Sequence, residues 1–137
     1  MTTALDTILS LSRARAHVVR ELDAELGAFH GLSLNDLALL LELRDAPDHK
    51  LRRVDLANRL GVTPSGVARQ LAPLERIGLV GREPHARDAR LALVVLTDAG
   101  IRLADDALPS AEEIAERVLA ERWSESDQAK LGRLLVG

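Results

Sequence analysis

Apolar residues recur at helical spacing near the start of the chain. Over residues 5–29 they form one stripe with a second stripe beside it: Leu5, Ile8, Leu9, Ala16, Val19 and Leu26, then Leu11, Val18, Leu22 and Phe29. At 100° per residue, the two stripes together cover about half of the helix circumference. A single small core needs a narrower face than this, so the pattern predicts a helix with a second buried contact, such as another subunit.

A second helix is expected after Gly31, because glycine commonly ends helices. Residues 33–36 (Ser-Leu-Asn-Asp) resemble a capping box in which Asp replaces the usual Glu. The predicted helix continues to about Arg44 and directs these side chains inward: Leu37, Leu40, Leu41 and Leu43. Residues 46–48 (Ala-Pro-Asp) have the chemistry of a turn and are expected to follow it.

The central segment has the pattern of a helix-turn-helix. Residues 54–60 form a short predicted helix that ends at Gly61, since glycine readily adopts the left-handed conformation of many helix ends. Thr63 is placed to cap the next helix, and Pro64 suits its first position, where no backbone donor is needed. This helix is predicted over 64–77, with these side chains buried: Val67, Leu71 and Leu74.

The opposite face of this second helix consists of small residues around one long hydrogen-bond donor. Its outward positions are Ser65, Ala68, Arg69 and Ala72. A helix with such a face fits deep into the major groove of DNA, where arginine reads the edge of a guanine. The pattern therefore predicts a recognition helix.

Two short β-capable runs, 79–83 and 91–96, are expected to form a hairpin with a polar tip at 84–90. The tip carries two cations, Arg87 and Arg90. In a winged helix, a hairpin at this point of the chain lies beside the same DNA, and its arginines enter the minor groove or bind phosphate. The hairpin is therefore predicted to be a two-stranded β-wing.

The last third of the chain again has helical periodicity, at the 3.5-residue spacing of a seam between packed helices. Thr97 is expected to cap this helix, and the seam consists of Ile101, Ala104, Leu108, Ala111, Ala115 and Val118. Pro109, followed by the capping-box-like residues 110–113, predicts a kink or a break. Residues 124–127 cap a final helix whose apolar end would be exposed in an isolated chain, which indicates a dimer: Leu131, Leu134, Leu135 and Val136.

Charge is distributed unevenly along the 137 residues. The net charge of −3 is the sum of −3 over residues 1–43, +4 over residues 44–90 and −4 over residues 97–137. A basic middle segment between acidic ends indicates one surface for a polyanion.

Composition excludes several classes of function. The chain has no Cys, and its aromatic residues are Phe29 and Trp123, so it lacks thiols for redox or metal chemistry and rings for stacking single-stranded nucleic acid. It has no glycine loop for phosphate, no nucleophile elbow and no paired histidine spacing, so no enzyme, cofactor or metal is expected. No stretch resembles a membrane span or a signal peptide, which predicts a cytoplasmic protein with no membrane partner.

Several short motifs follow one another in a specific order: Gly31-Leu32-Ser33, Asp55-Leu56-Ala57, Gly61-Val62-Thr63-Pro64-Ser65, Leu74-Glu75-Arg76-Ile77-Gly78-Leu79-Val80, Asp88-Ala89-Arg90 and Leu96-Thr97-Asp98-Ala99-Gly100. With these motifs, residues 31–100 resemble the MarR family of regulators, which includes the SlyA-type proteins. The resemblance implies a homodimer with a winged helix in each subunit, bound to a pseudo-palindromic operator in double-stranded DNA. It also implies a small-molecule effector, commonly anionic or phenolic.

The resemblance also implies roles for three residues. By position, Arg69 matches the arginine of the recognition helix, Arg90 matches the wing arginine, and Asp88 matches the acid of the Asp-x-Arg motif. A carboxylate beside an arginine directs that side chain with the modest strength of an exposed ion pair. Pro73 departs from the family pattern, because it removes the helical hydrogen bond to the carbonyl of Arg69 and is expected to bend the helix.

Other candidates keep two interpretations. Thr63 and Ser65 are caps first and DNA contacts second, and His85 either reaches a phosphate or is a solvated loop residue. Phosphate contact and ordinary surface charge fit equally well for Arg52, Arg53, Arg59, Arg76 and Arg82. Arg15 falls within the apolar arc of the first helix, where a guanidinium needs a partner. An intersubunit salt bridge is favoured there over a pocket for an anionic effector.

The sequence thus predicts a mainly α protein with residues 1–32 as an N-terminal dimerisation helix, 33–96 as the winged helix-turn-helix and 97–137 as C-terminal dimerisation helices, intertwined in one domain. The expected function is transcriptional repression as a homodimer. The predicted DNA-binding residues are Thr63, Ser65, Ala68, Arg69, Arg82, Arg87, Asp88 and Arg90. Two alternatives are a winged-helix protein-interaction module without sequence-specific DNA binding and a small-molecule binding protein that acts without DNA.

Overall fold

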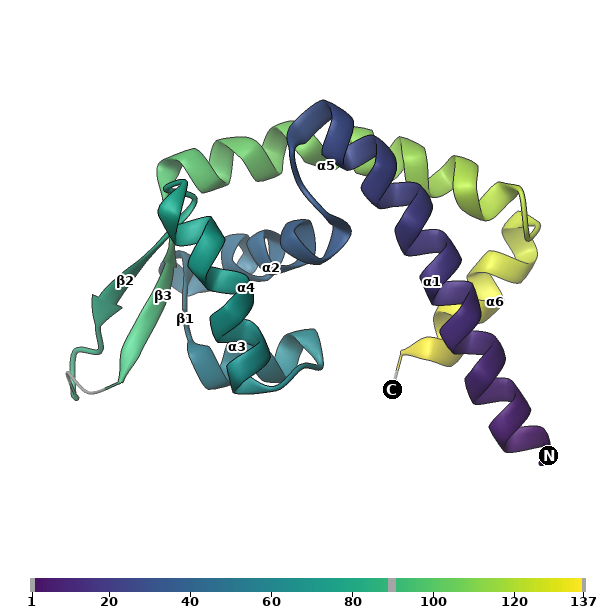
Figure 1. The fold of residues 1–137 in the computed structure, drawn as a ribbon, viewed down its shortest axis with the longest axis horizontal. Coiled ribbons are helices and arrows are strands. Elements are labelled where there is room, and N and C mark those ends of the chain that lie inside the picture. Colours follow the sequence, from purple (N-terminus) through teal and green to yellow (C-terminus); the bar gives the residue numbers. More distant parts are fainter. Residues whose placement is uncertain (1, 89–90, 137) are drawn as a thin grey trace. The chain divides into compact units, whose positions relative to one another are not determined.

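The computed structural model describes residues 2–88 and 91–136. Its elements in chain order are α1 (Thr3–His30), α2 (Leu34–Asp45), the 3₁₀ helix η1 (Pro47–His49), β1 (Lys50–Arg52), α3 (Arg53–Leu60), α4 (Pro64–Arg76), β2 (Val80–Pro84), β3 (Ala92–Leu96), α5 (Asp98–Ala120) and α6 (Glu125–Leu135) (Figure 1). The fold is mainly helical with a small antiparallel sheet, which confirms the predicted fold class. By internal contacts the chain forms two compact units, residues 35–108 and residues 1–34 with 109–137.

The sheet of the first unit has three strands in the order β1-β3-β2, all antiparallel. Strands β2 and β3 form the predicted hairpin, with Arg82 opposite Val94. The third strand, β1, was not predicted; it adds Leu51 on the other side of Val94. A three-residue strand carries too little alternation to be recognised in a sequence, and pairing with β3 stabilises it here.

The core of residues 35–108 is aliphatic. Its buried side chains come from the helices, the sheet and their connections: Leu37, Leu39, Leu40, Leu43, Ala46, Leu51, Leu56, Ala57, Val67, Leu71, Leu74, Leu79, Val80, Val94, Leu96, Ala104 and Ala107. Three of the four leucines predicted to face inward from α2 are fully covered, whereas Leu41 is half-buried. Leu39 is also buried, because α2 is covered on more of its circumference than one stripe.

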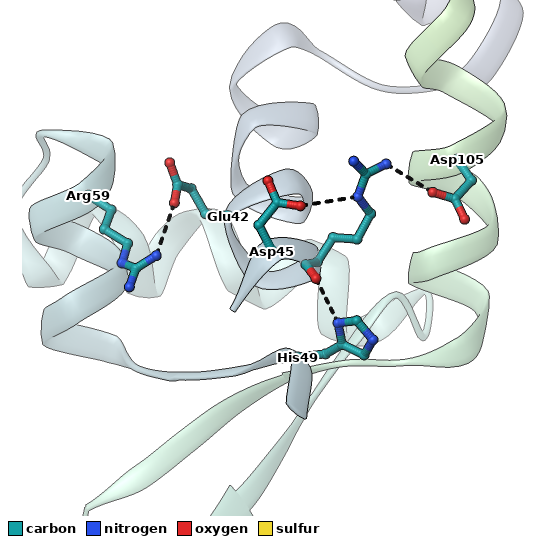
Figure 2. A network of polar contacts seen from close by, with 6 residues as sticks. Glu42, Asp45, His49, Arg59 and Asp105 are labelled. Atoms are coloured by element: carbon teal, nitrogen blue, oxygen red, sulfur yellow. Dashed lines mark hydrogen bonds and ion pairs between the residues drawn. The ribbon is translucent and has the colours of Figure 1, made fainter. Parts of the chain in front are cut away.

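Polar contacts tie α2 to its neighbours within this unit (Figure 2). Arg44, in the last turn of α2, donates a hydrogen bond from Nη1 to Oδ1 of Asp105 on α5 at 2.9 Å. The Arg44 carbonyl oxygen lies 2.8 Å from Nδ1 of His49. The residue before this histidine in η1, Asp48, has a positive φ. Glu42 and Arg59 pair at 3.6 Å between α2 and α3. These contacts add direction to a core that is otherwise held by non-directional aliphatic packing.

The start of α5 packs closely against the segment that leads from α4 into the wing. The Thr97 hydroxyl accepts a hydrogen bond from Gly100 N at 3.1 Å, as the predicted cap, and donates to the carbonyl oxygen of Gly78 at 2.6 Å. Gly100 is buried, and a Cβ at this position would overlap the carbonyl oxygen of Leu79 and the side chain of Leu96. Glycine is therefore required here by space.

The second unit consists of α1, the C-terminal part of α5 and α6. Helix α1 ends at Gly31, whose left-handed conformation (φ 68°) lets its N–H reach the carbonyls of the last turn, as predicted. Leu22 and Leu26 are buried, but the apolar residues nearer the N-terminus are exposed, with Ile8 at 62%. The predicted second contact of this helix is thus left open in a single chain.

The sequence predicted a kink or a break at Pro109, and helix α5 continues through Pro109 without a break. Proline removes one backbone hydrogen bond, but buried side chains before and after it, Ala107 and Ile114, keep the flanking turns packed. Ser110 does not begin a new helix; its hydroxyl lies 3.0 Å from Nε2 of His30 on α1. Arg117, further along α5, pairs with Glu25 of α1.

Helix α6 begins as predicted, with the Ser124 hydroxyl accepting a hydrogen bond from Asp127 N at 3.1 Å. Its last residues are exposed, with Leu134 at 74% and Val136 at 82%. Among the described residues, none of the helices combines the length and apolarity that crossing a lipid bilayer requires.

The steric argument at Gly100 predicts the result of a single methyl addition. Gly100→Ala should lower the free energy of unfolding by about 1 to 3 kcal/mol, because the added Cβ overlaps backbone that cannot move aside. Thermal unfolding followed by circular dichroism measures the effect. The matched control is Gly27→Ala in α1, where the added methyl group would meet no atom within 4 Å and helix propensity favours Ala. Equal stability of the two variants would contradict the argument.

Candidate nucleic-acid interface

Helices α3 and α4 are joined as a helix-turn-helix whose local geometry follows the predicted residues. Gly61 ends α3 in the left-handed conformation (φ 68°, ψ 32°), and its N–H is directed to the carbonyls of Ala57 and Asn58. The Thr63 side chain caps α4 by accepting a hydrogen bond from Gly66 N at 3.0 Å, and Pro64 occupies the first turn. The cap satisfies a backbone donor that the helix itself cannot pair.

The inner face of α4 is buried through Val67, Leu71 and Leu74, as predicted. Burial of these three side chains fixes which residues face solvent, because a helix turns about 100° per residue. The outer positions Ser65, Arg69, Ala72 and Arg76 are exposed, and Ala68 is half-buried. Gln70 lies on a flank and donates a hydrogen bond from Nε2 to the carbonyl of Asn35 at 2.8 Å, which holds α4 on the start of α2.

Pro73 lies inside α4, and the helix continues beyond it to Arg76. The carbonyl of Pro73 itself accepts a hydrogen bond from Ile77 N at 3.3 Å at the end of the helix. Arg69 therefore stands one turn before the proline, on a helix that is capped at its start and packed along its inner face.

The wing places its described residues beside this helix-turn-helix (Figure 1). Arg87 is exposed at the tip, and its backbone N–H donates to Nδ1 of His85 at 3.1 Å. This contact uses one histidine nitrogen within the loop. Asp88 is half-buried and engages in a polar interaction. The predicted wing arginine, Arg90, lies outside the described residues.

Acidic side chains hold several of the arginines near α3 and α4. Arg52 donates from Nε and Nη2 to the two carboxylate oxygens of Asp55, at 2.8 and 3.2 Å. Arg82, on β2, binds both oxygens of Glu75 from α4 in the same bidentate way, at 2.6 and 3.2 Å. The hydrogen bonds from Arg52 lower the pKa of Asp55, and those to Glu75 raise the pKa of Arg82. Arg59 pairs with Glu42.

A second set of arginines makes no ion pair within the part of the chain that the structure describes: Arg53, Arg69, Arg76 and Arg87. Arg53 of this set lines a groove of about 410 Å³ together with two of the acid-bound arginines, Arg52 and Arg82. The other lining residues are Val54, Pro64, Leu91 and Ala92. The groove lies between the starts of α3 and α4 and the wing strands. It combines three guanidinium groups with apolar side chains. Carboxylates bind Arg52 and Arg82, which leaves Arg53 as the guanidinium in the groove that can bind an anionic backbone.

The Arg52–Asp55 pair was not predicted, although its spacing in the sequence could have indicated it. Arg52 and Asp55 are three residues apart at the start of α3, a distance at which side chains on a helix meet. Glu75 as the partner of Arg82, and Glu83 as the partner of Lys50 at 2.7 Å, were not predicted. The residues in each pair come from different elements, so only the folded chain brings them together.

The second unit contains an apolar groove of about 530 Å³ between α1, the end of α5 and α6. Arg15 lies at this groove, where the sequence predicted a paired guanidinium, and is exposed in the single chain. Its neighbours are Ile8, Leu11, Ser12, Ala14, Val18, Leu119, Trp123, Leu131 and Leu135. In the described parts of the chain, no cluster of three or more His, Asp or Glu side chains is arranged to hold a metal ion.

These observations define a winged-helix protein of the DNA-binding type: a capped recognition helix with an exposed arginine, a basic groove and a β-wing. Residues 32–91 match the model of the MarR family. The chain is 29% identical over 129 residues to the HTH-type transcriptional repressor YetL of Bacillus subtilis, covering 94% of this chain and 74% of that protein. The chain belongs to the MarR family and is a transcriptional regulator, not an enzyme.

Solved structures show the same fold. The MarR family regulator Sco3205 from Streptomyces coelicolor, in complex with DNA, superposes with a TM-score of 0.86 at 26% identity, covering 98% of this chain and 86% of that one. BpsR of Bordetella bronchiseptica, whose DNA binding is regulated by 6-hydroxynicotinic acid, superposes with a TM-score of 0.85 at 21% identity. The match covers 98% of this chain and 94% of BpsR. The prediction of the family from sequence motifs is thereby confirmed.

Proposed function

We propose that this regulator is a homodimeric repressor that binds a pseudo-palindromic operator. In this proposal α4 enters the major groove, and the wing tip lies at the flanking minor groove, with the two recognition helices about 34 Å apart on one face of the duplex. The proposed DNA-contacting residues are Thr63, Ser65, Ala68, Arg69, Arg87, Asp88 and Arg90. Arg82, which the sequence also predicted as a DNA contact, is bound by Glu75 instead. The similarity to the repressor YetL supports the direction of regulation.

The observation that carries the proposal is the outer face of α4. Arg69 is exposed, has no ion pair among the described residues, and is surrounded by small residues that leave room for base edges. A protein-interaction helix would more typically present apolar or aromatic anchors on such a face. This contrast favours DNA over the protein-interaction alternative.

The exposed apolar residues of the second unit support the homodimer. Ile8 and Leu11 of α1 and Leu134 and Leu135 of α6 are exposed in one chain. Monomeric proteins seldom leave a patch of this kind in water. A second copy of the chain, packed helix to helix along this face, would cover it and set the spacing of the two recognition helices.

A small anionic or phenolic effector is the regulatory part of the proposal. Arg15 offers a cation beside an apolar groove, which suits a ligand with one acidic group on an apolar body. The ligand control of BpsR provides a precedent within the fold. An intersubunit ion pair is the competing role for Arg15, and ligand binding to an Arg15→Gln variant of the intact dimer separates the two.

Replacement of Arg69 tests the recognition helix. Arg69→Ala should weaken binding to DNA from upstream of the protein's own gene by about 1 to 3 kcal/mol and relax the preference at one base pair, because a bidentate contact to guanine is lost. Gel shifts with base-substituted duplexes measure both effects. Arg102→Ala, which removes an exposed arginine from α5, is the charge-matched control. Equal losses on all sequences would make Arg69 a phosphate contact instead.

The salt dependence of binding tests the polyanion surface. If a dimer neutralises roughly 6 to 10 phosphates, its affinity for duplex DNA should fall about a thousandfold or more between 50 and 200 mM salt. Fluorescence anisotropy with a labelled duplex follows this fall. A protein-interaction module or a ligand-binding protein without DNA would bind the duplex weakly at every salt concentration.

Sedimentation tests the dimer. The wild type should sediment at twice the chain mass of 14.9 kDa, and Ile8→Asp should shift it to a single chain, because a carboxylate is placed in an apolar interface. Thr7→Asp adds the same charge at an exposed polar neighbour and should leave the dimer intact. A wild type that sediments as a 14.9 kDa species at micromolar concentration would rule out the homodimer.

A further inference from the structure

The recognition helix carries an acid that binds a wing arginine. Glu75 lies in the last turn of α4, and Arg82 lies in the middle of β2. Both carboxylate oxygens are engaged, by Nε at 2.6 Å and by Nη2 at 3.2 Å. The Glu75 side chain is 26% exposed and the Arg82 side chain is 60% exposed, so the acid is the more deeply seated partner.

A bidentate carboxylate occupies the same donors that arginine offers to a phosphate. Guanidinium groups recognise carboxylate and phosphate through the same planar fork of N–H groups. While Glu75 holds Nε and Nη2 of Arg82, a phosphate oxygen cannot use this edge of the fork. The carboxylate also cancels the charge that would attract the DNA backbone.

Arg82 of this pair lines the basic groove, and Glu75 projects from a different side of α4 than Arg69. Around the axis of α4, Glu75 and Pro64 project within about 20° of each other, whereas Arg69 is about 120° from Glu75. Arg82 and Pro64 line the groove that also contains Arg52 and Arg53. Arg69 thus faces outward for base contacts, and the Glu75–Arg82 pair occupies the flank that faces the wing.

We propose that Glu75 limits the affinity of this protein for DNA by withholding Arg82 from the phosphate backbone. This inference rests on the DNA-binding function proposed above. In the free and the bound protein the pair links the wing to the recognition helix, and Arg82 does not release a counterion from the duplex. Arg53, Arg69, Arg76 and Arg87, which have no ion pair in the described chain, supply the electrostatic contacts instead.

A withheld arginine affects specificity as well as affinity. Phosphate contacts strengthen binding to every sequence equally, whereas base contacts strengthen binding to the operator alone. A cation that is kept from phosphate therefore lowers non-specific binding without weakening readout by Arg69. Since competing genomic sites are numerous, the ratio of operator to non-specific affinity is the quantity that such a device improves.

Glu75→Gln is the direct test, because glutamine keeps the shape of the side chain and removes its charge. Released Arg82 should add one phosphate contact per subunit. For a dimer, this makes the slope of log affinity against log salt concentration steeper by about 1.8. Between 50 and 200 mM salt the variant should lose about twelvefold more affinity than the wild type. The probe is a random-sequence duplex long enough for both subunits, measured by fluorescence anisotropy beside the upstream DNA of the gene.

Two further variants show whether Glu75 acts through Arg82. In an Arg82→Gln background, Glu75→Gln should change neither the affinity nor the salt slope. Glu83→Gln is the charge-matched control: Glu83 is the next residue on β2, so its side chain projects from the opposite face of the sheet, where it pairs with Lys50. This control should leave the salt slope within error of the wild type.

The Arg82→Gln variant alone provides a measurement that does not depend on the Glu75 variant being folded. It should leave the salt slope of the wild-type surface unchanged, while Arg87→Gln should reduce it by about 1.8 in the dimer. Circular dichroism confirms that each variant is folded before its binding is compared.

Several outcomes would overturn the proposal. If Glu75→Gln binds less tightly with an unchanged slope, Glu75 only positions the wing. If Glu83→Gln steepens the slope equally, the effect is one of net charge. A reduced slope in Arg82→Gln would show that Arg82 already contacts phosphate. If the wild type itself fails to bind either duplex with steep salt dependence, the DNA-binding function fails, which is a separate result from a failure at Glu75.

Discussion

The structure of the DNA-binding unit depends on how α4 is seated. Val67, Leu71 and Leu74 are buried against the core, and the Thr63 cap defines where the helix begins. Once the inner face and the first turn are set, the pitch of the helix decides that Arg69 faces solvent. The hydrogen bond from Gln70 to the carbonyl of Asn35 fixes the helix further against α2. Recognition chemistry is thus a consequence of aliphatic packing on the other side of the helix.

Electrostatics divides the arginines of this unit into two groups. Arg52, Arg59 and Arg82 are bound by acids, and the bidentate pairs of Arg52 and Arg82 make these side chains part of the scaffold. Arg53, Arg69 and Arg76 make no ion pair within the described residues and remain available to a polyanion. The net charge of a segment therefore overstates the charge it presents to DNA. A basic surface is better judged by its unpaired cations than by its total.

The other unit has the opposite character. Its helices expose large apolar side chains, and α1 and α6 contribute most of them. Within each chain, Leu22 and Leu26 are buried and Arg117 pairs with Glu25, so the helices have their own contacts before any partner is added. An exposed apolar face of this kind supports the second subunit proposed above.

The sequence by itself determined most of the helices and strands, and the family. The spacing of apolar residues and the capping residues located α1, α3, α4, α6 and the β2–β3 hairpin, because those signals are local to each segment. Tertiary structure decided what depends on distant partners: the strand β1, the uninterrupted α5 at Pro109, and the pairing of Arg82 with Glu75. Local patterns cannot encode these features, since each of them is stabilised by groups that only the folded chain brings together.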